Sequence, residues 1–349
     1  MNITSVASAF PKHYYPQSVL LSELQKFWGP KLENPAMMDR LYSRIGVEGR
    51  YTALPVEQYP GLERWGAANQ HWIEISQELG EQALGCALKR AHLEPTGIDA
   101  LFFVSITGIA SPSIDARLIN RMGLSTSLKR IPIFGLGCVA GAAGIARAAD
   151  YVRAFPDQIA AVLSVELCSL TLQHDDVSMA NLISAGLFGD GAAAVLVAGA
   201  ERSMPGPAIL ATRSFFYPGT EHVMGWDISE KGFQIVLSRE VPEVVEQHLA
   251  ADVDTFLAEQ GLTHGDIQTF ILHTGGPSVL EAAEHALNLP PGALDVSWAC
   301  LRRMGNLSSA SVLMVLEEVM LHRRPDPGTY SILAAMGPGF CSEFVLLKW

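Results

Sequence analysis

Two stretches decide the fold: GCVAGAA at residues 137–143 and GNLSSAS at residues 305–311. Each follows an apolar segment that ends in Thr-Gly, and each opens a helical pattern rich in small residues. Cys138 comes 31 positions after Thr107, and Asn306 comes 32 positions after Thr274. Two copies of one α/β unit would place Cys138 and Asn306 at equivalent helix N-termini, related by a pseudo-twofold axis. Small residues there predict that the two helices pack closely.

The chain as a whole is globular and of the α/β class. Its 349 residues are 49% hydrophobic and 17% charged, which suits one large layered fold or two related halves. Apolar runs at residues 100–106, 160–165 and 192–197 alternate with helical periodicity. The Pro/Gly-marked MPGP at residues 204–207 is the candidate boundary, which predicts halves at residues 1–203 and 204–349.

Charge and cysteine usage exclude several classes of function. A net charge of −12 argues against a nucleic-acid or anionic-membrane surface, so a phosphate-bearing ligand must meet a local basic cluster. The five cysteines form no CxxC pair, and His, Asp and Glu do not cluster at ligand spacing. We therefore expect no disulfide framework and no metal site. Neither a signal sequence nor an apolar run of about 18 residues is present, so we expect a cytoplasmic protein without a membrane span.

Cys138 is the candidate nucleophile. At the first turn of a helix, unsatisfied N–H groups and the macrodipole favour thiolate over thiol. The alternative is a buried, inert cysteine. His273 ends an apolar segment that begins at residue 270, where a hydrogen-bonded core histidine is the alternative. Cysteine, histidine and asparagine together divide the work of acyl transfer into attack, proton handling and oxyanion binding.

Five motifs now occur in one order along nearly the whole chain: LGCVAG (136–141), LFGDGA (187–192), HTGGP (273–277), GNLSSA (305–310) and MGPGF (336–340). In these motifs the chain resembles the chalcone-synthase-like, or type III, polyketide synthases. The resemblance implies a thiolase-like fold, which is a duplicated, five-layered αβαβα architecture with pseudo-twofold halves. It also implies a homodimer that uses acyl-CoA and malonyl-CoA as substrates and needs no cofactor.

The resemblance further implies a role for each catalytic residue. Cys138 takes the acyl group as a thioester. His273 and Asn306 bind the malonyl thioester, drive the loss of carbon dioxide and stabilise the enolate. The enolate then attacks the acyl group on Cys138, and cyclisation of the extended chain ends the cycle.

Further residues follow from the same resemblance. Phe188 matches a gatekeeper between the coenzyme A tunnel and the cavity, although a core phenylalanine would look alike. The cavity is expected to include Cys168, Thr171, Ile235, Ser308 and the loop residues Gly337 and Pro338. Arg40 and Arg44, at i and i+4, match cations that meet the phosphates of coenzyme A, with a solvated helix face as the alternative. Ser111 and Ile235 depart from the methionine and second gatekeeper phenylalanine of plant members.

The product class follows from the end of the chain and from one cavity residue. The ending AMGPGFCSE (335–343) is similar to that of bacterial members that make alkylpyrones and alkylresorcinols, which predicts a medium- or long-chain fatty acyl starter. The alternative is a malonyl-primed naphthalene-polyol synthase, for which Cys168 gives some support. An initiating β-ketoacyl-acyl carrier protein synthase would have Asn-x-Arg-Ile after the histidine, where this chain has GGP (275–277). A cysteine hydrolase and a catalytically silent acyl-binding protein are the alternatives from other classes.

Overall fold

The computed structural model describes residues 1–62 and 64–349. In this part of the chain nine strands form one sheet, in the order β11-β12-β13-β8-β1-β7-β6-β4-β5. A single residue pair, Asn2 with Ala208, joins its two parts through β1 and β8. The strands are β1 (Asn2–Ala9), β4 (Ala100–Val104), β5 (Lys129–Ile133), β6 (Ile159–Leu167), β7 (Asp190–Ala198), β8 (Ala208–Phe216), β11 (Ile267–Leu272), β12 (Tyr330–Gly337) and β13 (Cys341–Lys348).

The two parts of the sheet repeat one topology. In the first, β4 lies parallel to β6, and β7 and β1 follow antiparallel. In the second, β11 lies parallel to β12, and β13 and β8 follow antiparallel. The helices repeat as well, because α3 (Trp65–Arg90) and α5 (Ala140–Ala154) have the same places in chain order as α7 (Val241–Ala258) and α10 (Ala310–His322). The predicted duplication of one α/β unit is confirmed.

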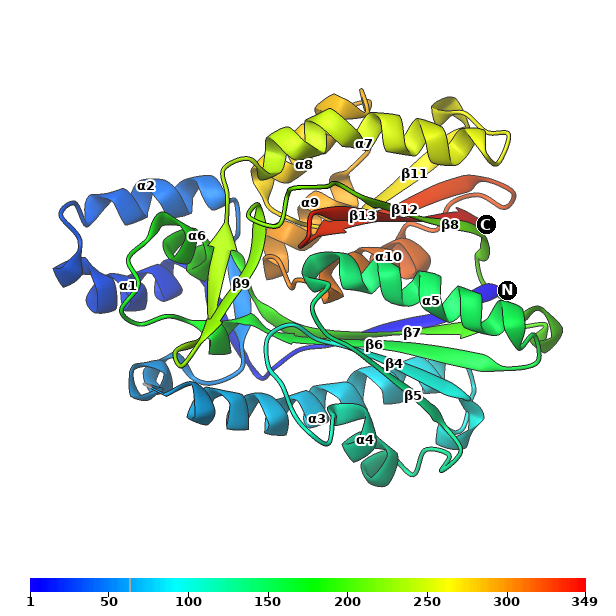
Figure 1. The fold of residues 1–349 in the computed structure, drawn as a ribbon, viewed down its shortest axis with the longest axis horizontal. Coiled ribbons are helices and arrows are strands. Elements are labelled where there is room, and N and C mark those ends of the chain that lie inside the picture. Colours follow the sequence, from blue (N-terminus) through cyan, green and yellow to red (C-terminus); the bar gives the residue numbers. More distant parts are fainter. Residues whose placement is uncertain (63) are drawn as a thin grey trace.

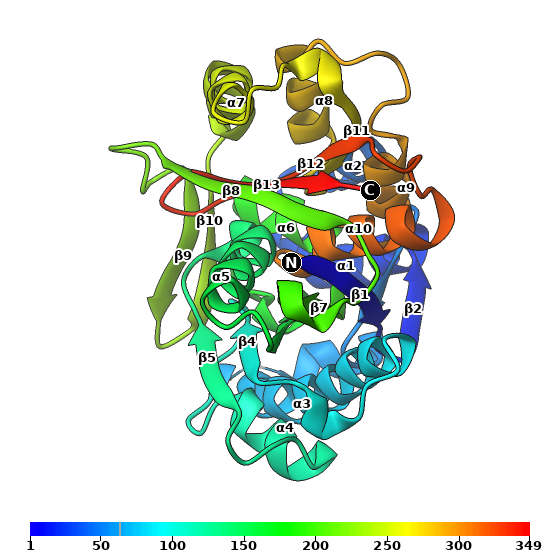
Figure 2. The same cartoon turned by 90° about the vertical axis from the view of Figure 1, so that its right-hand side faces the viewer.

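Five layers result from this duplication (Figures 1 and 2). Helices α3 and α4 (Ile114–Met122) cover one outer face, and α7 and α8 (Pro277–Ala286) cover the other. Helices α5 and α10 lie between the two parts of the sheet, and residues on all their sides are buried. Every residue of β6 and β7 is buried too, as expected for strands covered on both faces. The predicted αβαβα architecture is confirmed.

The central helices pack backbone to backbone. A Cβ added at Gly141 of α5 would lie 2.1 Å from the carbonyl oxygen of Ser309, immediately before α10. The predicted close approach is therefore present, and only glycine permits it.

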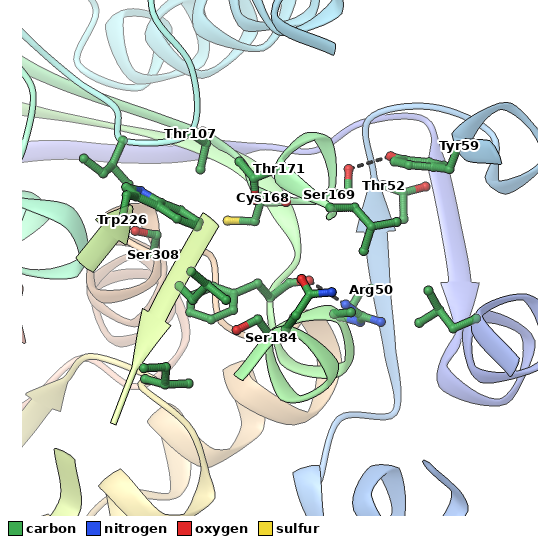
Figure 3. Close-up of a pocket in the computed structure, with 18 of the residues that line it drawn as sticks. Arg50, Thr52, Tyr59, Thr107, Cys168, Ser169, Thr171, Ser184, Trp226 and Ser308 are labelled. Carbon is green, nitrogen blue, oxygen red and sulfur yellow. Dashed lines mark hydrogen bonds between the residues drawn. The ribbon is translucent and has the colours of Figure 1, made fainter. Parts of the chain in front are cut away.

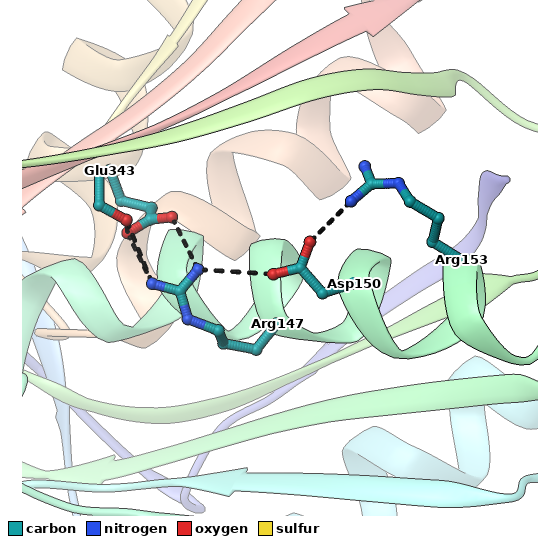
Figure 4. A network of polar contacts seen from close by, with 5 residues as sticks. Arg147, Asp150, Arg153 and Glu343 are labelled. Atoms are coloured by element: carbon teal, nitrogen blue, oxygen red, sulfur yellow. Dashed lines mark hydrogen bonds and ion pairs between the residues drawn. The ribbon is translucent and has the colours of Figure 1, made fainter.

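A polar network also connects α5 to the second part of the sheet (Figure 4). Arg147 donates to the carboxylate of Glu343 on β13 and to Ser214 Oγ on β8, and it forms an ion pair with Asp150. Burial raises the pKa of Glu343. The network fixes α5, whose N-terminus carries Cys138, relative to the C-terminal half.

The predicted boundary at residues 203 and 204 lies between β7 and β8, and it remains a prediction. None of the helices in the described ranges is long and apolar enough to cross a membrane.

Smaller elements gather at one end of the layered core (Figure 1). The elements at this end are α1 (Gln17–Trp28), α2 (Ala36–Ile45), α6 (Met179–Leu187), the strand pair β2 (His13–Pro16) and β3 (Gly49–Thr52), and the hairpin of β9 (Met224–Ser229) and β10 (Gly232–Leu237).

Candidate active site

Cys138 lies in a 3-10 turn, Gly137–Val139, that runs directly into α5. Gly137 has φ +54°, and a Cβ there would lie 2.7 Å from the ring of Pro338. Gly337 packs on the same turn, since its own Cβ would lie 2.6 Å from the backbone nitrogen of Val139. The loop after β12 therefore supports the candidate nucleophile from behind, and the predicted position of Cys138 at a helix start is confirmed.

Asn306 is fixed by its backbone and its side chain. Its backbone N–H donates to Leu187 O at 2.9 Å, and its carbonyl accepts from Gly189 N at 2.9 Å, so it forms a β-bridge with Phe188. Its Nδ2 donates to Gly275 O at 3.2 Å, two residues after His273. Asn306 does not open the helix as expected, because α10 begins only at Ala310.

Ser308 connects the two halves at the site. Its φ of +48° is unusual for a residue with a side chain. Cys138 Sγ donates to Ser308 Oγ at 3.6 Å, and Ser308 N donates to Asn306 Oδ1 at 2.8 Å. Cys138 and Asn306, which are predicted to be equivalent positions of a repeat, thus lie on either side of Ser308.

Burial decides the resting charges of the site. It raises the pKa of Cys138 to about 12, although the contact with Ser308 acts in the opposite direction. It lowers the pKa of His273 to about 4, and His273 Nδ1 has no hydrogen-bond partner within the described ranges. Burial thus opposes the ionisation that the helix start is expected to favour at Cys138. The resting pair is a thiol and a neutral imidazole.

A buried carboxylate lies behind the nucleophile. Glu166 on β6 accepts from Ile106 N at 3.1 Å, from Thr107 Oγ1 at 3.0 Å, and from Ser309 Oγ. Burial raises its pKa to about 7, and its charge adds to the rise in the pKa of Cys138. Through Glu166, Thr107 of the first Thr-Gly pair is connected to Ser309. These contacts link the segment after β4 to the segment before α10.

Two cavities meet at the site. One, of about 150 Å³, contains Cys138, and the other, of about 710 Å³, contains His273 and Asn306. Phe188 lines both, as do Met224 and Leu237, which pair across the β9–β10 hairpin. The smaller cavity, part of which is drawn in Figure 3, is lined by the predicted residues Cys168, Thr171, Ile235, Ser308 and Pro338. Gly337, predicted with them, lines neither cavity, because it packs against the turn that carries Cys138.

Only one of the two arginines predicted to meet coenzyme A lines a cavity. Arg44 lines the larger cavity, whereas Arg40 is exposed and lines neither. Ser111 is also exposed and outside both cavities. Sequence reasoning missed other residues that line the cavities. Two are cations to which it gave no role, Arg50 and Arg239, and three lie on the β9–β10 hairpin, Met224, Trp226 and Leu237.

Comparison with known proteins shows the family to which the chain belongs. The family model for the N-terminal domain of chalcone and stilbene synthases matches residues 3–201, and the one for their C-terminal domain matches residues 208–349. The chain belongs to this family. The synthase is thus a type III polyketide synthase, an acyltransferase that condenses coenzyme A thioesters with decarboxylation and needs no cofactor.

Bacterial synthases are among its relatives. The synthase is 51% identical to 1,3,6,8-tetrahydroxynaphthalene synthase of Streptomyces peucetius subsp. caesius, over 100% of its own length and 93% of the relative's. It is 37% identical to a putative chalcone synthase of Bacillus subtilis, with 89% of each chain covered. The crystal structure of tetrahydroxynaphthalene synthase from Streptomyces coelicolor superposes with a TM-score of 0.93 at 31% identity, covering 100% of the synthase and 99% of that chain. The predicted thiolase-like fold is confirmed.

Proposed function

We propose that the synthase uses malonyl-CoA both as starter and as extender and forms a naphthalene polyol. The observation that carries this proposal is the 51% identity, over the whole chain, to a tetrahydroxynaphthalene synthase. It favours the alternative considered above over an alkylpyrone product.

The first step loads the starter onto Cys138. The phosphates of malonyl-CoA would meet Arg44 and Arg239, which line the larger cavity. The neutral imidazole of His273 accepts the thiol proton as sulfur attacks the thioester carbonyl. The carbon–sulfur bond to coenzyme A breaks, and the proton passes to the departing thiolate. Malonyl-Cys138 and free coenzyme A result.

The second step makes the new carbon–carbon bond. His273 and Asn306 donate hydrogen bonds to the thioester oxygen of a second malonyl-CoA. Carbon dioxide leaves, and its bonding electrons form an enolate, which attacks the carbonyl on Cys138 and expels the Cys138 sulfur. The extended chain then returns to Cys138 for the next round. Asn306 is oriented for this task, since one Nδ2 hydrogen goes to Gly275 O and leaves the other for substrate.

Phe188 would separate these two events in space. It lines both cavities, and its backbone is paired with Asn306. An apolar ring there excludes water from the enolate while the acyl chain extends on the other side.

Incubation with malonyl-CoA alone tests the product class. We expect a naphthalene polyol without any added starter, and an unchanged yield across fatty acyl-CoA starters of two to eighteen carbons. Product that appears only with added fatty acyl-CoA, and grows with its length, would restore the alkylpyrone prediction. Release of free coenzyme A also separates the synthase from a silent acyl-binding protein.

We also propose that two copies of the chain form a homodimer. Ile109 and Phe134 keep 48% and 46% of their surface exposed near the ends of β4 and β5, and large apolar side chains on a surface favour an interface. Sedimentation should give twice the chain mass for the wild type, and a smaller species for a variant with both residues changed to glutamate. A monomeric wild type would contradict the proposal.

A further inference from the structure

Arg50 is a buried cation in the wall of the catalytic cavity. It lies on β3, is 5% exposed, and lines the same cavity as Cys138. Its Nε donates to Gln17 Oε1 at 3.2 Å and its Nη1 to Phe188 O at 2.5 Å. Both acceptors are neutral. Within the described ranges its Nη2 makes no hydrogen bond and the guanidinium forms no ion pair.

The carboxylates near Arg50 are occupied elsewhere. Asp190 accepts from Ala53 N at 2.5 Å, from Ser169 N at 2.8 Å and from Ser169 Oγ, and it forms no ion pair with Arg50. Glu23, which lines the cavity, pairs with Lys26 at 2.7 Å. A buried charge without an ion-pair partner is costly, and burial lowers the pKa of Arg50, although the charge of Asp190, beyond ion-pair distance, acts in the opposite direction. Arg50 is therefore placed to bind an anionic ligand.

The surroundings of Arg50 form a lobe of the catalytic cavity, since Arg50 and Cys138 line one cavity. In the view of Figure 3, Cys168 lies between Ser308, the neighbour of Cys138, and Arg50. Thr52 and Ser184 line the same cavity. A chain attached to Cys138 can therefore extend past Cys168 toward Arg50. A guanidinium offers a carboxylate paired donors in a fixed geometry.

We propose that Arg50 binds the free carboxylate at the starter end of the growing polyketide and thereby draws the chain into this lobe. The inference rests on the proposed function, because only a malonyl starter carries such a carboxylate. Loading onto Cys138 and each later condensation leave that carboxylate intact. Every condensation adds two carbons between it and the thioester, so the charge advances toward Arg50 as the chain grows. A fatty acyl chain would bring no anion to this site.

Product length from malonyl-CoA alone tests the proposal. The measured quantity is the ratio of full-length naphthalene product to shorter pyrones. We expect this ratio to fall about 10- to 100-fold in Arg50→Met, which corresponds to one hydrogen bond to a charged group. Arg50→Lys keeps the charge but loses the paired donors, so its ratio should lie between those of the wild type and Arg50→Met. Gln17→Leu is the matched control, since it removes a neutral contact of Arg50 but leaves the cation in place.

Three results would overturn the proposal. The first is an unchanged ratio in Arg50→Met. The second is an equal loss in Gln17→Leu, and the third is an equal loss in Arg50→Lys. The last two would show that the ratio depends on the local packing around Arg50 and not on an anion bound to its guanidinium.

A measurement on the wild type covers the case in which the variants do not fold. Malonyl-CoA whose carboxylate is capped as a methyl ester cannot decarboxylate and can serve only as starter. Once its loading onto Cys138 is verified by intact mass, it should give shorter products than uncapped starter, and equal lengths would overturn the proposal. The proposed function fails separately, if the wild type makes nothing from malonyl-CoA alone.

Discussion

Replacing Gly141 by alanine should separate the two halves of the active site. The added Cβ would lie 2.1 Å from Ser309 O, whereas real Cβ atoms essentially never come closer than 3.0 Å. The helices α5 and α10 must therefore move apart by at least about 0.9 Å, because neither backbone atom can rotate away. The same movement lengthens the 3.6 Å contact between Cys138 and Ser308.

A displacement of this size has a calculable cost. A misplacement of about 1 Å at reacting groups lowers the rate by about 10²-fold, and overpacking lowers the free energy of unfolding by about 1–3 kcal/mol. In the proposed mechanism, condensation needs Cys138 from one half and His273 with Asn306 from the other. Decarboxylation of malonyl-CoA needs only the latter two. We expect condensation in Gly141→Ala to fall about 100-fold and decarboxylation to fall far less.

Gly85→Ala on α3 provides the control for this prediction. The nearest atom to its added Cβ, Met122 Cε, is 4.0 Å away, so the same substitution meets ordinary contact. It should raise the free energy of unfolding by about 0.5–1 kcal/mol and leave both activities unchanged. Thermal unfolding, carbon dioxide release and product yield are measured on both variants. Equal losses of condensation and decarboxylation in Gly141→Ala would refute the reasoning, since they would reflect unfolding rather than separation.

Four further outcomes are expected. Cys138→Ala should abolish extension but retain some malonyl-CoA decarboxylation, and any extension product would contradict the assignment. Asn306→Ala should slow decarboxylation by about 10²–10³, while intact mass still finds an acyl group on Cys138. Arg44→Ala should raise the KM for malonyl-CoA more than it lowers kcat, whereas Arg40→Ala, outside both cavities, should change neither. In a Cys86→Ser background, alkylation of Cys138 should accelerate about tenfold per pH unit from pH 7 to 10, because its pKa is about 12; a plateau near pH 7 would contradict this.

Sequence predicted those features that depend on local pattern. The spacing of Thr107 and Cys138, repeated by Thr274 and Asn306, is a property of one α/β unit, and it survives in the duplicated topology. Small residues after Cys138 predicted the close helix pair for the same reason. These inferences needed no knowledge of which distant segments meet.

Features that depend on distant contacts were beyond such reasoning. The i, i+4 spacing puts Arg40 and Arg44 on one helix face, but α2 turns only Arg44 to a cavity. Met224 and Leu237 separate the two cavities because a hairpin folds across them. The charge of Cys138 depends on burial by segments from both halves, which no helix-end argument measures.

Burial of the nucleophile has a function that its helix-end position does not reveal. The desolvation that protonates Cys138 and neutralises His273 also excludes the water that would hydrolyse a thioester or quench an enolate. A charged resting pair would attract that water. The free enzyme therefore holds its two groups neutral, and charge separates only when a thioester enters and supplies the carbonyl for the sulfur to attack. In the proposed mechanism, proton transfer from Cys138 to His273 accompanies substrate binding, so acylation rather than thiolate formation in the free enzyme should set the pH dependence of loading.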